Sequence, residues 1–103
     1  MSLYYVQKFL YQINREPALQ QYFRDSSDAA LADYDLTEEE RAALMKPDIG
    51  LLYVLGVNGQ LLMHYAAFAG YEWNAYLQAM RDGVARYGPV RAGIYAMTTG
   101  APP

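Results

Sequence analysis

The single histidine, His64, is the residue of this sequence best suited to chemistry at neutral pH. Imidazole titrates close to that pH, so His64 could act as a general base or hydrogen-bond a substrate. The other interpretation is a histidine at the rim of a helix whose nitrogens bond to water or backbone. One histidine and no cysteine allow no pair of histidine ligands and no thiolate set. The sequence therefore predicts that this chain binds no metal and no other cofactor.

The remaining polar clusters fit structural roles better than catalytic ones. The three glutamates at positions 38–40 are consecutive, so on one helical turn they point in different directions and form no catalytic pair. Ser26 and Ser27 have no base nearby and suit helix caps. The sequence GVNG at 56–59 lacks the pattern of a phosphate-binding loop and follows no predicted strand. We therefore predict no catalytic residues and, for the chain alone, an accessory rather than an enzymatic role.

Length and charge limit the class of protein. The 103 residues predict one domain spanning residues 1–103, and the formal charge of −3 argues against nucleic acid or an anionic membrane as a partner. No apolar stretch reaches the roughly 20 residues needed to span a bilayer. The N-terminal residues lack a basic leader followed by a long apolar run. These features, with the absence of cysteine, predict a soluble cytoplasmic protein.

The stretch from Leu36 to Gly56 organises the fold. Thr37 and Glu40 have the spacing of a capping box and predict a helix beginning there. Pro47 should end that helix. Asp48 then offers a second N-cap for the apolar segment IGLLYVL, which is predicted to be buried.

The rest of the chain also reads as short helices. The periodicity of apolar residues and the capping signals predict helices over Leu3 to about Asn14, Pro17 to Asp25, Asp28 to about Tyr34, Gln60 to Ala69 and Glu72 to Arg81. After Gly83 the glycines and Pro89 indicate an irregular tail over residues 83–103. The predicted fold class is all-α, a compact bundle of about five to seven short helices with an irregular C-terminal tail.

Large aromatic side chains are concentrated between residues 61 and 73. The chain has 11 tyrosines, a residue that favours half-buried positions and interfaces. A short helix and its cap cannot normally hide so much aromatic surface, and exposed patches of this kind mark partner sites. We predict a surface that contacts a partner or covers a substrate pocket, formed by Leu61, His64, Tyr65, Phe68, Tyr71 and Trp73.

Two segments carry a resemblance to a known family. Phe9 to Met45 resembles the α (small) subunit of protocatechuate 4,5-dioxygenase and its relatives, with a helix ending near Asn14-Arg15-Glu16, a helix with Tyr22-Phe23-Arg24 and an alanine-rich helix with Tyr34. Residues 66–83, AAFAGYEWNAYLQAMRDG, are similar to that family's alanine- and glycine-containing stretch and the helix after it. Together these segments span about Phe9 to Gly83. The order and spacing of several weak motifs carry the resemblance.

The resemblance implies a partner. Extradiol dioxygenases of this family open catechol-type rings, and their large β subunit carries the non-haem iron(II) and the catalytic base. The helical α subunit packs over the β subunit's pocket as a lid. The resemblance therefore implies a large catalytic dioxygenase subunit as the partner and places Leu61 to Gly70 near the mouth of its pocket.

Two other functions fit the sequence. Residues 3–45 also resemble the helical leader region of some modified-peptide precursors, which serves as a docking handle for the modifying enzyme. The C-terminal half is rich in aromatics of the buried type, which disfavours a simple substrate peptide. The third interpretation is a stand-alone helical interaction module that forms a homo-oligomer. The genes beside this one would separate the three.

Overall fold

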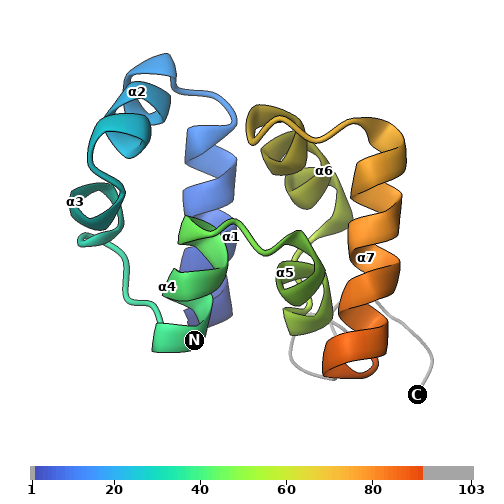
Figure 1. Ribbon diagram of the computed structural model, residues 1–103. Helices are drawn as coiled ribbons and strands as arrows, with labels where there is room; N and C mark the ends of the chain where they lie inside the picture. The colour runs from blue at the N-terminus through green and yellow to red at the C-terminus, as the bar shows by residue number, and fades with distance from the viewer. Residues whose placement is uncertain (1, 92–103) are drawn as a thin grey trace.

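The computed structural model describes residues 2–91, which form seven helices and no strand and confirm the predicted all-α bundle. Figure 1 shows α1 to α4 in one half of the molecule and α5 to α7 in the other. The chain passes once from the first half to the second, between α4 and α5. The helices are α1 (Ser2–Ile13), α2 (Pro17–Asp25), α3 (Ser27–Leu31), α4 (Glu38–Met45), α5 (Ile49–Leu55), α6 (Gly59–Phe68) and α7 (Trp73–Tyr87).

The two predicted caps at the centre of the chain are confirmed. The Thr37 hydroxyl accepts a hydrogen bond from the Glu40 backbone N–H (3.1 Å), and the Glu40 carboxylate accepts one from the Thr37 N–H (2.9 Å). Asp48 caps α5 by accepting from the Leu51 N–H. These bonds satisfy donors that a helix cannot satisfy itself, and so fix where both helices begin.

The hydrophobic core is drawn from all seven helices. The inner face of α1 contributes Val6, Phe9, Leu10 and Ile13, each fully buried. Phe9 packs against Phe23 of α2 and Tyr65 of α6, with ring centroids 5.4 and 6.4 Å apart. Because this aromatic cluster joins both halves, it fixes how α6 lies against α1.

Helices α5 and α7 run side by side in Figure 1 and touch at two glycines. A Cβ atom on Gly83 would lie 2.4 Å from the Gly50 Cα, and one on Gly50 would lie 2.6 Å from the Ala79 carbonyl oxygen. Real side chains do not come so close to backbone, so only glycine allows this contact.

This contact corrects one predicted boundary. The sequence predicted that the last helix ends at Arg81 and that an irregular tail begins at residue 83, but α7 continues through Gly83 to Tyr87. Gly83 serves the close contact with α5 and does not end the helix. Gly88, with φ of 93°, ends it instead. Residues 88–91 lie outside the helices, and the rest of the predicted tail, 92–103, lies outside the described residues.

The chain after α7 is fastened to both halves of the molecule. The Arg91 backbone N–H donates to the Val54 carbonyl, and the Arg91 guanidinium pairs with both carboxylate oxygens of Glu39 at 2.8 and 3.2 Å. This charged hydrogen bond lowers the pKa of Glu39.

Across residues 2–91, no helix has the length and apolar character to cross a membrane.

Candidate functional site

Tyr65, one of the six side chains predicted at a partner surface, lies in the core. It is 1% exposed, and its hydroxyl donates a 2.7 Å hydrogen bond to the Leu44 carbonyl of α4. Burial raises the pKa of Tyr65 well above the usual tyrosine value. The structure therefore corrects its predicted place on the surface: Tyr65 holds α6 against α4.

Three of the other predicted residues, Phe68, Tyr71 and Trp73, have different surroundings. Phe68 is half-buried, with the Arg24 guanidinium 4.5 Å from its ring centroid. Trp73 is 58% exposed at the first turn of α7. Tyr71 is half-buried and lines a separate groove of about 300 Å³ beside α5 and α7. Whether any of them contacts a partner remains a prediction.

The groove beside Tyr71 is held by a side-chain hydrogen bond. The Tyr87 hydroxyl of α7 donates to the Asp48 carboxylate at 2.6 Å, while the other oxygen of Asp48 caps α5. This bond to Asp48 raises the pKa of Tyr87. Both oxygens of Asp48 are thus engaged in joining α5 to α7, which indicates a structural role for this groove.

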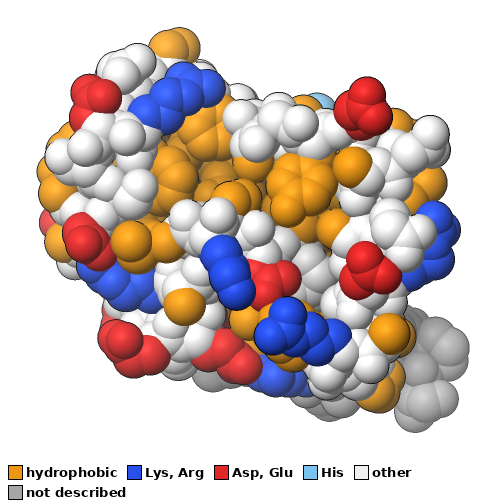
Figure 2. Space-filling model, viewed as in Figure 1, with side chains coloured by type: hydrophobic (Ala, Val, Ile, Leu, Met, Phe, Trp, Pro, Cys, Tyr) orange, Lys and Arg blue, Asp and Glu red, His pale blue; other side chains and the backbone are white. Residues whose placement is uncertain are grey.

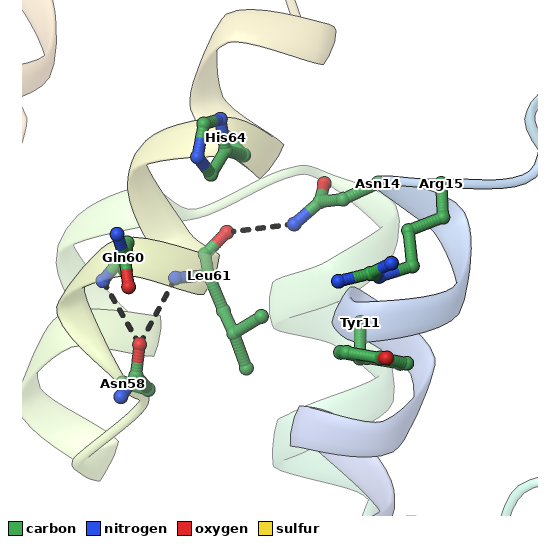
Figure 3. Close-up of a pocket in the computed structure, with 7 residues that line it drawn as sticks. All are labelled: Tyr11, Asn14, Arg15, Asn58, Gln60, Leu61 and His64. Carbon is green, nitrogen blue, oxygen red and sulfur yellow. Dashed lines mark hydrogen bonds between the residues drawn. The ribbon is translucent and has the colours of Figure 1, made fainter.

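Leu61 and His64, the last two predicted residues, line a cleft of about 590 Å³ between the end of α1 and the start of α6 (Figure 3). His64 is exposed and Leu61 is half-buried. The cleft is more polar than the predicted surface, because five residues that the sequence did not indicate also line it: Tyr11, Asn14, Arg15, Asn58 and Gln60.

Two asparagines, Asn58 and Asn14, form the hydrogen bonds that hold the walls of the cleft in place. The Asn58 side chain caps α6 by accepting from the Gln60 and Leu61 N–H groups at 3.0 and 3.1 Å. Its own backbone N–H donates to the Gln7 side chain of α1. From the end of α1, the Asn14 amide donates to the Leu61 carbonyl at 3.1 Å, as Figure 3 shows. These bonds fix the start of α6 relative to α1.

The charge of the cleft comes from Arg15. Its guanidinium lies 4.2 Å from the ring centroid of Tyr11, one turn earlier on α1, within the range of a cation–π contact. No carboxylate is among the described residues that line the cleft. It can therefore offer hydrogen-bond donors and one permanent positive charge to a bound group.

The described residues do not fit an iron site. Within residues 2–91, no group of three His, Cys, Asp or Glu side chains could hold a metal ion together. The carboxylates nearest the centre of the chain have other partners: Asp48 bonds Tyr87, and Glu40 completes the capping box. That this chain binds no metal remains a prediction.

The fold and the cleft define a small all-helical domain with a polar cleft and, among its described residues, no metal-binding cluster. Figure 2, in the view of Figure 1, shows hydrophobic, acidic and basic side chains mixed over one face of the domain. Residues 6–86 match the family described as the aromatic-ring-opening dioxygenase LigAB, LigA subunit. The match spans most of the chain, so the chain belongs to this family, and the resemblance found in the sequence is confirmed. No curated protein and no solved structure matches the chain significantly.

Proposed function

We propose that this chain is a non-catalytic small subunit that binds the catalytic subunit of an extradiol aromatic-ring-opening dioxygenase and helps to close its active site. Membership of the LigA-subunit family carries the proposal, because that family is named for one component of the LigAB ring-opening dioxygenase. The cytoplasm is the proposed location of the complex.

The chemistry of the described residues supports an accessory role. In the proposed complex, iron(II) belongs to the catalytic subunit and supplies ring-opening chemistry there. Its exposed side chains include an aromatic one, Trp73 at 58%, and the cleft adds the guanidinium of Arg15 and the imidazole of His64. Such groups suit the binding of another protein, because tyrosine, tryptophan and arginine are the usual anchors of interfaces.

Closing the active site is the contribution that a bound small domain can make without catalytic residues. A domain that covers a pocket expels water, which strengthens the electrostatic interactions inside it. In this arrangement, His64 hydrogen-bonds a polar group at the pocket mouth, either of the catalytic subunit or of the substrate. Leu61, half-buried beside it, adds apolar contact.

Co-expression with a catalytic ring-opening dioxygenase subunit from the same organism tests the proposal. We expect the two chains to co-purify and ring cleavage of catechol-type substrates to rise when this chain is present. Trp73→Ala should weaken the complex, whereas Met45→Ala, which changes a 38% exposed side chain on α4, should not. Failure of the two chains to associate, or equal ring cleavage with and without this chain, would overturn the proposed role.

A further inference from the structure

The exposed face of α1 carries an unusual set of side chains. Tyr4, Lys8 and Tyr11 are spaced four and three positions apart, so they line one face of the helix, and Arg15 follows two residues after the helix ends, with its guanidinium over the Tyr11 ring. All four are exposed, with Tyr4 at 60% and Tyr11 at 51%. Tyrosine and arginine are enriched at protein interfaces. We call these four residues the α1 stripe.

The segment that carries the α1 stripe has a net positive charge in an otherwise acidic protein. Lys8 and Arg15 are the only charged side chains among residues 1–15, and both are cationic. The formal charge of the whole chain is −3, so the residues after Arg15 carry −5. Two cations on a negative protein are too few for nucleic acid, whose binding requires many phosphate contacts.

The stripe runs into the cleft between α1 and α6. Tyr11 and Arg15 belong to both, and beside them the cleft presents Gln60 and His64. Glu16, the carboxylate nearest to Arg15 in the sequence, does not line the cleft. Its charge acts on Tyr34, whose hydroxyl donates to the Gln12 side chain: burial raises the pKa of Tyr34, and the negative charge of Glu16 raises it further. The described residues thus form a continuous surface of aromatic rings and hydrogen-bond donors, with no carboxylate lining the cleft.

Arg15 is also restrained before any partner binds. Its guanidinium lies over the Tyr11 ring at 4.2 Å from the centroid. An arginine already restrained in this way loses less conformational freedom when it pairs with a carboxylate.

We infer that the α1 stripe and the adjoining cleft bind an acidic surface of the catalytic dioxygenase subunit. The inference rests on the proposed function and names the face that docks and the charge of what it meets. It places Leu61 and His64, from the originally predicted surface, at the contact with the partner. Tyr71 lines a different groove and takes no part in this contact.

Two matched pairs of variants test the inference in the co-expressed complex. Arg15→Glu is paired with Arg86→Glu, because Arg86 is also an exposed arginine near a tyrosine ring, at 5.3 Å from the Tyr87 centroid. Both changes alter the net charge equally. Tyr11→Ala is paired with Tyr22→Ala, since Tyr22 on α2 is 48% exposed and lies outside the stripe. Circular dichroism checks that each variant is folded, and Lys8→Glu replaces Arg15→Glu or Tyr11→Ala if either is not.

The dissociation constant of the complex, measured at about 50 and about 300 mM salt, gives the result. At low salt, Arg15→Glu and Tyr11→Ala should each weaken binding by about tenfold or more, while Arg86→Glu and Tyr22→Ala stay within about twofold. Salt should weaken the parent complex more than the Arg15→Glu complex, because it screens the charge pair that the variant lacks.

The outcomes separate the two proposals. If the parent chain binds the catalytic subunit but all four variants bind equally well, the α1 stripe is not the docking face and the subunit role stands. Equal weakening by Arg15→Glu and Arg86→Glu would show an effect of net charge alone and would also overturn the inference. If the parent chain does not bind at all, the proposed function itself fails.

Discussion

Helices α5 and α7 approach until their backbones touch, whereas α1 and α6 leave a polar cleft between the end of one and the start of the other. The close pair meets at Gly50 and Gly83, where no side chain fits. The open pair is bridged by the amide of Asn14, which donates to Leu61, and by Gln7, which accepts from Asn58.

The difference separates the residues that hold the fold from those free to bind. At the close pair, small residues give dense packing that any added atom disturbs. At the cleft, exposed side chains such as Arg15 and His64 contribute little to folding and remain available to a partner. Neighbouring residues of α6 show the same difference: Tyr65 packs into the core, whereas His64 lines the cleft.

The largest expected effect comes from adding one carbon at the close pair. Gly83→Ala would place a Cβ 2.4 Å from the Gly50 Cα and 2.5 Å from the Gly50 carbonyl carbon, and neither backbone atom can move without shifting α5. We expect the free energy of unfolding to fall by about 3 kcal/mol, the upper end of the usual cost of overpacking. Urea unfolding followed by circular dichroism measures it.

The same substitution near the cleft should act in the opposite direction. Gly59, at the first position of α6, has no atom within 4 Å of its added Cβ. Gly59→Ala should therefore stabilise the domain by about 0.4–1 kcal/mol, because it restricts the unfolded chain without strain. If both alanine variants are equally stable, the contact between α5 and α7 is not as close as the structure shows.

A smaller effect than that of Gly83→Ala distinguishes the core face of α6 from the exposed face of α1. Tyr65→Phe leaves the buried Leu44 carbonyl without the hydroxyl that donates to it at 2.7 Å, which should cost about 1–2 kcal/mol. Tyr11→Phe, at a 51% exposed position, should change stability by less than about 0.5 kcal/mol. Equal losses in the two variants would contradict the assignment of Tyr65 to the core.

The buried hydroxyl of Tyr65 also predicts a dependence on alkaline pH. Burial raises the pKa of Tyr65 in the fold, so above the ordinary tyrosine pKa of about 10 the unfolded chain loses this proton and the folded chain keeps it. The contribution to stability is complete below a pH of about 10 and is lost as the pH rises further. In unfolding series at pH values of about 9, 10 and 11, the parent should lose up to about 1.4 kcal/mol per pH unit more than the Tyr65→Phe variant.

The sequence predicted the elements whose signals are local. The capping box at Thr37, the Asp48 cap and the start of α2 at Pro17 are confirmed, since each depends on residues within one helical turn. The full length of α7 could not be predicted, because glycine normally weakens a helix and only the distant Gly50 explains why Gly83 belongs inside one.

The candidate site was predicted only in part. Leu61 and His64 line the cleft, but the spacing of Leu61, Tyr65 and Phe68 is that of the packed face of a helix, a signal that could have placed Tyr65 in the core. The contribution of α1 could not be found from local pattern. Asn14 and Leu61 are 47 positions apart in sequence, and only the packing of α1 against α6 brings them together.

The last expected effect belongs to the cleft wall and is small because two costs at Asn14 oppose each other. The amide nitrogen must face the Leu61 carbonyl, because a carbonyl only accepts, and this bond contributes about 0.5–1.5 kcal/mol. The amide oxygen is buried and makes no hydrogen bond within the described residues, at a cost of similar size. Asn14→Ala removes both contributions, so the free energy of unfolding should change by less than about 1 kcal/mol.

Asn14→Asp is the matched variant, since it keeps the shape but turns a second acceptor toward the Leu61 carbonyl. It should cost more than Asn14→Ala, about 1–3 kcal/mol, because neither oxygen of the new carboxylate can donate. Urea unfolding at neutral pH compares both with the parent. A loss above about 2 kcal/mol in Asn14→Ala would contradict the balance of the two costs at Asn14.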